Sequence, residues 1–409
     1  MLHGLLYGLE EKMYADSIGM QDYYAASICI NRLPYYNIKK IFWLCAPPRR
    51  NGVGDVRVGT PNRKKRCSIT ARYEVIADWI AQWNVHFVEP TVFGTTNPQQ
   101  IADLIATFCQ KELDASVEEY LFYTSSIGAV CGVRLEDKRR VVIKVHQPFR
   151  SPDFLKAVVR VQHYLIDHGY PCPKPLLAPR PLAYSIATTE ELVDEGIYHQ
   201  AHDPAIRRSM AEMLAWLVQL TRAPETIPDL QPAVLDIRLP SGVIWPSPHS
   251  KLFDFDATTR GAKWIDEIAY KAQEIKLHGA GQLVIGHVDW GVKHFRYIND
   301  HVRVIYDWDS LSFEKEPIIV GQASGYFTYT EFFGSARHPT NEETRAFIAE
   351  YEAARGKPFT PEELQTLEAA KLYGLAYGAR CEHALQPDET KYPDGSCRSR
   401  LAQLRKELL

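Results

Sequence analysis

Residues able to bind metal, move protons or hold phosphate are concentrated in the stretch VIGHVDWGVKHFRYINDHVRVIYDWDSL. His287, Asp289 and His294 follow one short apolar segment, and Asp307 and Asp309 follow the next. Phosphoryl transfer from ATP requires one carboxylate to orient the attacking hydroxyl and another to hold the metal that bridges the phosphates. Asp289 suits the first role and Asp307 the second, while Asp309 is left open between metal binding and orientation of its loop.

These two carboxylates can act together only if the chain brings them side by side. The apolar segments are short and the second is followed directly by Asp307. Two neighbouring strands with a tight turn would therefore make the side chains converge. Lys293 lies in the same stretch; it could reach a phosphate, but a solvated position is favoured. His287 is interpreted as a structural histidine and His294 as either a metal ligand or a support of the loop.

An upstream lysine can complete such a site. In VVIKV, Lys144 shares one face of the expected strand with Val142 and His146. A lysine pointing inward from a sheet needs an anionic partner, and a bound nucleotide would supply one. In the turn TSSIG, Ser126 and Gly128 belong to a segment whose backbone N–H groups could contact the same phosphates.

The elements that position these residues form a regular pattern from about residue 98. Ser151 as N-cap, Pro152 in the first turn and Gly169 at the end predict a helix between them. The other expected elements are a helix at 98–113, strands at 120–123, 129–135 and 141–146, an extended connector at 171–179, strand structure within 181–193, short strands within 281–311, and helices at 203–222, 259–278, 341–355 and 360–384. A small sheet with one inserted helix, followed by a mainly helical part, predicts an α+β protein.

Composition is ordinary for a soluble globular protein. The chain has 409 residues, of which 45% are hydrophobic and 24% charged, and its formal net charge is −3. Neither a nucleic-acid nor a membrane partner is therefore expected. No run of about 18 apolar residues suggests a membrane span, and the N-terminal sequence does not resemble a secretory signal. Eight cysteines without a C-x-x-C pair favour a reducing compartment, and we expect a cytoplasmic location.

The N-terminal quarter is the least informative part of the sequence. We interpret residues 1–97 as an extension of uncertain order. Its basic, Gly/Pro-containing stretch 49–66 could touch nucleic acid but is better explained as a solvated loop. NGVGDVRVG lacks the third glycine of a dinucleotide-binding loop, because Arg57 occupies that position.

The segments 286–296 and 304–311, here called the two chemical loops, together resemble loops of the aminoglycoside phosphotransferase family, which has a bilobal protein-kinase-like fold. GHVDW…KHFR resembles the H-x-D-x-x-x-x-N loop of that family, and VIYDWDSL resembles its D-x-D segment. Further matches are VVIK at Lys144, the connector HGYPCPKPL and the hinge-like strand ATTEELV. The likeness in plan extends over about residues 100–384.

The resemblance implies a small antiparallel-sheet N-lobe with one helix at 98–195 and a helical C-lobe at 196–409. It also implies a small-molecule kinase that uses ATP with Mg²⁺, or Mn²⁺, and phosphorylates a hydroxyl-bearing small molecule. The oligomeric expectation is a monomer or a homodimer.

The resemblance also implies roles for individual residues. Asp289 would be the catalytic base, Asp307 and His294 the metal ligands, and Lys144 the phosphate-binding lysine. The segment from Glu190 to Val193 would supply backbone contacts to adenine, with Glu191 and Val193 as nucleotide-binding residues. The acceptor is expected against the helical lobe, where acids such as Glu331, Glu350 and Glu382 could meet a cationic substrate.

Two departures keep other functions open. His294 occupies the position of the usual asparagine, although kinases that act on macrolides are similar in this respect. The helix at 152–168 contains no glutamate to pair with Lys144; the acidic position of the family falls on Val158, and Gln162 is the nearest polar candidate. The alternatives are an inactive nucleotide-binding protein of the same fold and a metal-dependent hydrolase with His287, Asp289, His294 and Asp307 as ligands.

Overall fold

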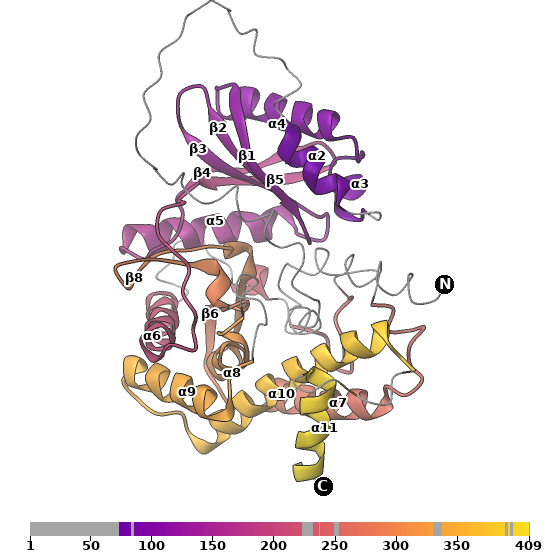
Figure 1. The fold of residues 1–409 in the computed structure, drawn as a ribbon. Coiled ribbons are helices and arrows are strands. Elements are labelled where there is room, and N and C mark those ends of the chain that lie inside the picture. The colour runs from indigo at the N-terminus through magenta and orange to yellow at the C-terminus, as the bar shows by residue number, and fades with distance from the viewer. Residues whose placement is uncertain are drawn as a thin grey trace, which may run out of the picture.

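The computed structural model has two lobes that pack on each other (Figure 1). It describes residues 73–82, 86–222, 232–236, 238–248, 253–329, 338–388, 392 and 396–408. The basic stretch 49–66 and Glu331 lie outside these residues. None of the helices in the described part of the chain combines the length and hydrophobicity that crossing a membrane requires.

The N-lobe is built on an antiparallel sheet with strand order β1-β2-β3-β5-β4. Its strands are β1 (Val117–Ser125), β2 (Ala129–Leu135), β3 (Arg140–His146), β4 (Pro175–Leu182) and β5 (Ser185–Glu191). Val141, Ile143 and Val145 of β3 are buried in one apolar cluster, which leaves Lys144 on the opposite face. The predicted alternation of this strand is therefore confirmed.

Three helices cover the apolar face of this sheet (Figure 1). They are α2 (Glu74–Ala81), α3 (Val88–Val92) and α4 (Pro98–Glu112). Ile76, Val88 and Val92 belong to the same buried cluster as the sheet. The lower boundary of the N-lobe, set at residue 98 from the sequence, stays a prediction. Residues before this boundary, from Ile76 on, pack in the same apolar cluster as the sheet.

Helix α5 (Pro152–Asp167) lies between the sheet and the C-lobe (Figure 1). The Ser151 side chain accepts a hydrogen bond from the Phe154 N–H, and Gly169 follows with a φ of 78°. Both predicted ends of this helix are therefore confirmed. Its buried residues, including Leu155 and Val158, belong to the apolar cluster of the C-lobe. The helix thus forms the surface on which the N-lobe sheet meets the helical half.

The C-lobe combines long helices with two small antiparallel sheets, β6 with β9 and β7 with β8. Its elements are α6 (Pro204–Thr221), α7 (Lys263–His278), β6 (Leu283–His287), β7 (Phe295–Ile298), β8 (His301–Ile305), β9 (Leu311–Lys315), α8 (Glu316–Tyr326), α9 (Asn341–Arg355), α10 (Pro361–Leu385) and α11 (Cys397–Leu408). The fold is thus α+β, as predicted. Strand β4 replaces much of the expected extended connector, because Leu177 pairs with Thr189 of β5.

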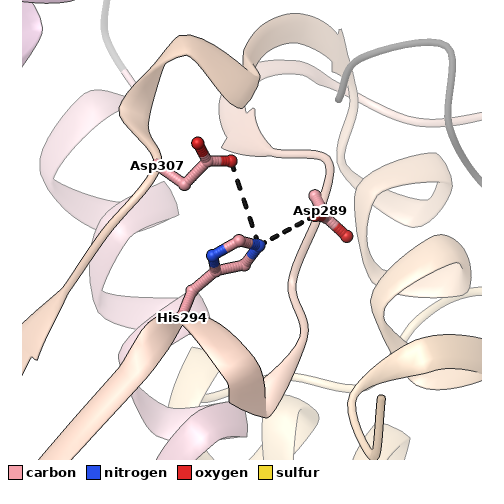
Figure 2. A group of neighbouring side chains, drawn as sticks. All are labelled: Asp289, His294 and Asp307. Atoms are coloured by element: carbon pink, nitrogen blue, oxygen red, sulfur yellow. Dashed lines mark hydrogen bonds and ion pairs between the residues drawn. The ribbon is translucent and has the colours of Figure 1, made fainter. Parts of the chain in front are cut away.

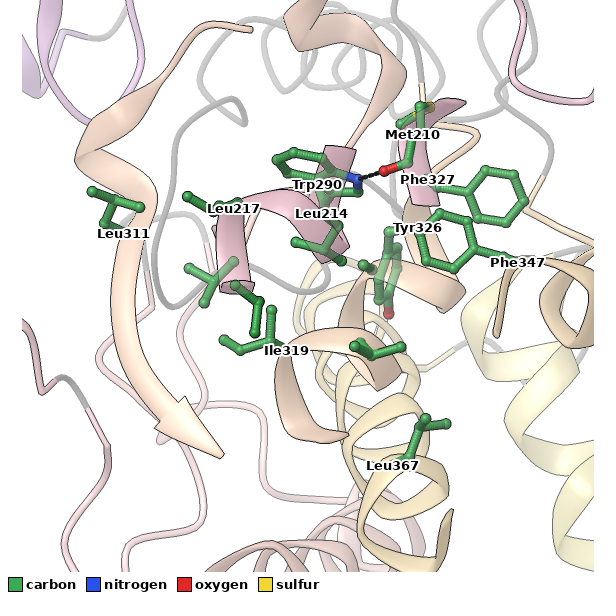
Figure 3. Packing of buried hydrophobic residues seen from close by; sticks show 14 of the residues in the cluster. Met210, Leu214, Leu217, Trp290, Leu311, Ile319, Tyr326, Phe327, Phe347 and Leu367 are labelled. Carbon is green, nitrogen blue, oxygen red and sulfur yellow. Dashed lines mark hydrogen bonds between the residues drawn. The ribbon is translucent and has the colours of Figure 1, made fainter. Parts of the chain in front are cut away.

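Trp290 fixes the loop after β6 to the core of the C-lobe (Figure 3). Its side chain is 1% exposed, and its indole N–H donates to the Met210 carbonyl of α6 at 3.1 Å. Leu214 of α6 and Ile319 of α8 belong to the same cluster. Burial of this large side chain holds the neighbouring Asp289 in a defined place.

Glu316 is a second fixed point of the C-lobe. Its carboxylate is fully buried and lies 2.9 Å from Arg355 Nε and 3.2 Å from Arg222 Nη2. Tyr351 donates its hydroxyl hydrogen to the same carboxylate at 2.8 Å. The contacts join the start of α8 to α6 and α9.

We predict that Glu316→Ala lowers the free energy of unfolding by about 3–5 kcal/mol, because it leaves the buried Arg355 guanidinium without its main counter-charge. Urea denaturation measures the effect. Glu267→Ala is the matched control, since Glu267 is more than half exposed and pairs loosely with Lys263. Loss of one exposed helix pair should change stability by at most about 0.5 kcal/mol. Equal stabilities of the two variants would contradict the prediction.

Candidate active site

The β7–β8 hairpin brings the two chemical loops together. Phe295 pairs with Ile305 at its open end, so the residues just before β7 and just after β8 lie side by side. The Tyr306 N–H donates to the His294 carbonyl at 3.0 Å, and the Val288 N–H donates to the Ser310 carbonyl at 2.9 Å. The convergence expected from the sequence follows from these backbone contacts.

Asp289, His294 and Asp307 form one group at this place, with possible ligand atoms all within 4.8 Å of one another (Figure 2). His294 Nε2 lies 2.8 Å from Asp289 Oδ2 and 3.9 Å from Asp307 Oδ2. The imidazole therefore points between the two carboxylates. Its hydrogen-bonding partner is Asp289, a contact that the sequence analysis did not foresee.

Asp289 is held by two nitrogen groups on the same oxygen. Lys293 Nζ lies 2.9 Å and His294 Nε2 2.8 Å from Asp289 Oδ2. Burial tends to raise the pKa of the Asp289 carboxyl, but Lys293 and His294 outweigh burial and hold this pKa below its usual range. Lys293 is itself buried, at 7% exposure, so the expectation of a solvated lysine is wrong.

The loop after β8 has a local conformation that directs Asp307. The backbone of Asp307 is left-handed, with φ 76° and ψ 47°, which aspartate tolerates better than most residues. The Ser310 hydroxyl donates to Asp307 Oδ2 at 3.0 Å, and Trp308 is buried directly after the aspartate. A short 3₁₀ turn thus presents Asp307 and Asp309 toward the N-lobe.

Lys144 reaches these carboxylates from the N-lobe. Its Nζ lies 3.5 Å from Asp309 Oδ1 and 3.8 Å from Asp307 Oδ1. It also lies 3.4 Å from Glu190 Oε1 of β5. Burial favours a lower pKa for Lys144, but the charges of Glu190, Asp309 and Asp307 raise its pKa, so the ammonium stays protonated.

The two aspartates of the D-x-D segment respond differently to their surroundings. Burial, followed by the charge of Asp309, raises the pKa of Asp307 well above its usual value. Burial also acts on Asp309, but Lys144, His146 and Arg150 lower the pKa of this carboxyl. Adjacent carboxylates that cannot both ionise easily indicate local negative charge in excess of the protein's own cations.

The donor set fits a divalent cation at this position. Asp307 supplies carboxylate oxygens, the ligands that Mg²⁺ prefers, and a cation would relieve its unfavourable ionisation. His294 supplies an imidazole nitrogen, which suits Mn²⁺ better than Mg²⁺. The assignment of Asp307 and His294 as ligands stays a prediction that this geometry is compatible with.

Glu190 is the residue that the sequence analysis missed, because only its backbone was expected to contribute. Its side chain is buried and faces Lys144. Gln162 of α5 donates its amide hydrogen to Glu190 Oε2 at 3.3 Å. The acid that the helix lacks is thus supplied by the neighbouring strand, and the strand alternation in ATTEELV was the available signal.

His287 links the two loops from behind the carboxylates. It is buried, and its Nε2 lies 3.3 Å from the Tyr306 carbonyl oxygen. Burial, with a smaller contribution from His294, lowers the pKa of His287 to about 3. A neutral, buried imidazole that contacts backbone is what the structural interpretation of this residue predicts.

The expected nucleotide-binding residues lie toward opposite ends of β3, since Ala129 pairs with Val145 and Glu191 with Val141. In the β1–β2 turn, the Ser126 N–H donates to the Gly128 carbonyl at 3.0 Å. A Cβ atom at Gly128 would lie 2.7 Å from the Val145 carbonyl oxygen, so this turn can approach β3 only with glycine.

The hinge segment after β5 has its own backbone contacts. The Glu191 N–H donates to the Lys174 carbonyl at 2.9 Å. The Val193 carbonyl accepts a hydrogen bond from the Tyr306 hydroxyl. The segment is thus tied both to the connector before β4 and to the loop that carries Asp307.

The acids proposed for substrate binding are used inside the C-lobe where the structure describes them. Glu350 forms a close ion pair with Arg207 at 2.8 Å. Glu382 accepts hydrogen bonds from the backbone N–H groups of Cys397 and Arg398. A separate cavity of about 340 Å³ lies beside the loop that carries Asp289, with Val288 in its wall.

The comparisons with known proteins agree with the fold that the sequence suggested. Residues 130–314 match the model of the phosphotransferase enzyme family. Amicoumacin kinase in complex with AMP-PNP, Ca²⁺ and Ami is 12% identical, with a TM-score of 0.51 over 75% of this chain and 92% of that one. At this identity the likeness shows the fold alone, which is shared over nearly the whole of that kinase.

Other similar structures have lower scores. An ethanolamine kinase from Plasmodium vivax is 12% identical, with a TM-score of 0.47 over 83% of this chain and 95% of that one. A macrolide 2′-phosphotransferase type I is 15% identical, with a TM-score of 0.45 over 74% of this chain and 96% of that one. No curated protein matches the sequence. The matched residues 130–314 include Lys144, Asp289, His294 and Asp307, so the similarity to the phosphotransferase enzyme family covers the candidate site.

Proposed function

We propose that this protein is an ATP-dependent kinase that transfers the γ-phosphate to a hydroxyl group of a small molecule. The observation that carries the proposal is the convergence of Asp289, Asp307 and Lys144 from three separate segments. A carboxylate for the acceptor, a carboxylate for the metal and a lysine for the phosphates are the parts that phosphoryl transfer needs.

Asp289 is assigned as the base that orients the acceptor hydroxyl and receives its proton. Oδ2 already accepts hydrogen bonds from Lys293 and His294, so we assign Oδ1 to the acceptor. The low pKa of Asp289 keeps the carboxylate ionised and therefore able to accept a hydrogen bond. Lys293 and His294 fix its orientation, which limits the positions that the acceptor hydroxyl can occupy.

Lys144 is assigned to the nucleotide phosphates, and Asp307 to a divalent cation. A bound Mg²⁺ or Mn²⁺ would neutralise phosphate charge during transfer. Ser126 and Gly128 are assigned to the phosphate side of the nucleotide, and Glu191 and Val193 to backbone contacts with adenine. The cytoplasmic location and the oligomeric state stay predictions from the sequence.

The alternative functions have less support from this geometry. An inactive nucleotide-binding protein was favoured by the missing helix acid, but Glu190 supplies a carboxylate to Lys144 from another element. A metal-dependent hydrolase gives no role to Lys144, whose ammonium lies among the same carboxylates. The nature of the acceptor is left to experiment, with ADP release measured over a panel of hydroxylated small molecules.

We predict that Asp289→Asn lowers turnover by about 10²–10⁴, the range for a lost acid/base group, while ATP affinity changes little. Turnover is measured as ADP release with the best acceptor of the panel, and ATP affinity by calorimetry. Asp300→Asn is the control, because Asp300 is exposed in the β7–β8 turn and has a φ of 62°. Asparagine tolerates this left-handed backbone. Full turnover of Asp289→Asn would refute the assignment of the base.

Asp307→Ala should abolish the dependence of ATP binding on metal. Wild-type protein is expected to gain thermal stability with ATP and Mg²⁺ or Mn²⁺, by about 2.7 kcal/mol at a ligand concentration of 100 Kd, and to lose this gain in EDTA. The variant should give equal melting temperatures with ATP in both conditions. A metal-dependent shift that persists in the variant would assign the cation to other residues.

A further inference from the structure

We propose that Glu190 is the positioning residue of Lys144, so that the lysine and its acid both belong to the N-lobe sheet. The inference rests on the proposed function, since it concerns how the phosphate-binding lysine is held. In protein kinases the acid that pairs with this lysine comes from a helix, and the position of that helix controls activity. Here the sheet itself provides both members of the pair.

The register of β3 and β5 makes the pair a consequence of strand pairing. Lys144 lies opposite Thr188, and Val142 lies opposite Glu190. Lys144 and Glu190 are therefore diagonal neighbours on one face of an antiparallel pair, a distance that long side chains span. Nζ and Oε1 are 3.4 Å apart, and both side chains are at most 12% exposed.

Helix α5 contributes to this pair only through a neutral group. Gln162 donates its amide hydrogen to Glu190 Oε2 at 3.3 Å and to the Pro173 carbonyl at 3.4 Å. Val158, at the position where the family has its acid, is buried in the C-lobe cluster. An amide can orient the carboxylate but cannot balance the charge of Lys144.

The position of Glu190 explains how Lys144 can serve a nucleotide. Asp307 and Asp309 attract the ammonium from the C-lobe side, and Glu190 attracts it from the sheet. Without Glu190 the ammonium would be drawn toward the aspartates that the metal requires. With Glu190 it is fixed before the phosphates arrive, so little ordering is needed on binding. Movement of α5 alone would then leave the pair assembled.

The test is a double-mutant cycle on the full-length protein, with ATP·Mg²⁺ affinity measured by calorimetry and thermal stability measured in parallel. Lys144→Ala should weaken binding, and Glu190→Gln should weaken it by about 10- to 100-fold, as expected for loss of a contact to a charged group. In the Lys144→Ala background, Glu190→Gln should cause no further loss of affinity, because Glu190 acts through Lys144. Glu119→Gln on β1, which removes an exposed partner of Arg134, is the matched control and should bind as wild type.

A purely structural role of Glu190 would give equal losses of affinity in both backgrounds, and this result would overturn the inference. If Glu190→Gln does not fold, Glu190→Asp replaces it in the same cycle, since it keeps the charge but withdraws the carboxylate by one methylene. Failure of wild-type protein to bind ATP would instead contradict the proposed function. The two failures are thus distinguishable.

Gln162→Leu tests whether the helix is secondary. It should weaken ATP binding by at most about threefold, because it removes a neutral donor and leaves the Lys144–Glu190 pair in place. A loss as large as that of Glu190→Gln would show that α5 controls the lysine, and the inference would be wrong.

Discussion

Burial of several carboxylates in one small volume is the constraint on which the arrangement of both lobes depends. Asp289, Asp307 and Asp309 lie in two short loops of the C-lobe. Such a group of carboxylates is stable only if positive charge lies within a few ångströms. Lys293 supplies this charge from the same loop as Asp289. Lys144 supplies it from the N-lobe. Packing of the N-lobe on the C-lobe therefore also places a positive charge beside the aspartates.

The remaining architecture can be understood as support for these two lysines. The β7–β8 hairpin sets the separation of the two loops, and Trp290 fixes the first loop to α6. On the other side, pairing of β3 with β5 sets the direction of Lys144. Helix α5 packs with the C-lobe core and lies against the N-lobe sheet. It thereby sets the position of β3 and β5 relative to the β7–β8 hairpin. Backbone pairing and apolar packing thus determine where the charges meet.

The parts of this structure that depend on local pattern could be predicted from the sequence. The alternation in VVIKV indicated the face of Lys144, and Ser151 with Gly169 indicated the limits of α5. The short apolar segments before Asp289 and Asp307 indicated the convergence of the loops. These features are encoded within a few residues of where they act, so periodicity and capping were sufficient.

Other parts depend on contacts between distant segments. Strand β4 was expected as an extended connector, because a proline-rich segment shows its pairing with β5 only once the sheet is assembled. Helix α8 is buried on nearly all sides by the C-lobe, and a helix without an exposed face has no amphipathic period. The burial of Lys293 likewise depends on Tyr329, whose ring centroid lies 4.8 Å from the ammonium.

The substitution of His294 for asparagine can be understood from its two contacts. An amide offers an oxygen to a metal and a separate N–H₂ group to a neighbour, whereas the outer nitrogen of an imidazole must serve whichever partner is closer. In this structure the closer partner is Asp289 at 2.8 Å, and Asp307 is farther at 3.9 Å. His294 therefore contributes first to holding Asp289. A cation that also used this nitrogen would compete with the hydrogen bond to Asp289. Such competition would couple the choice of metal to the orientation of Asp289 and would favour an ion that accepts nitrogen readily.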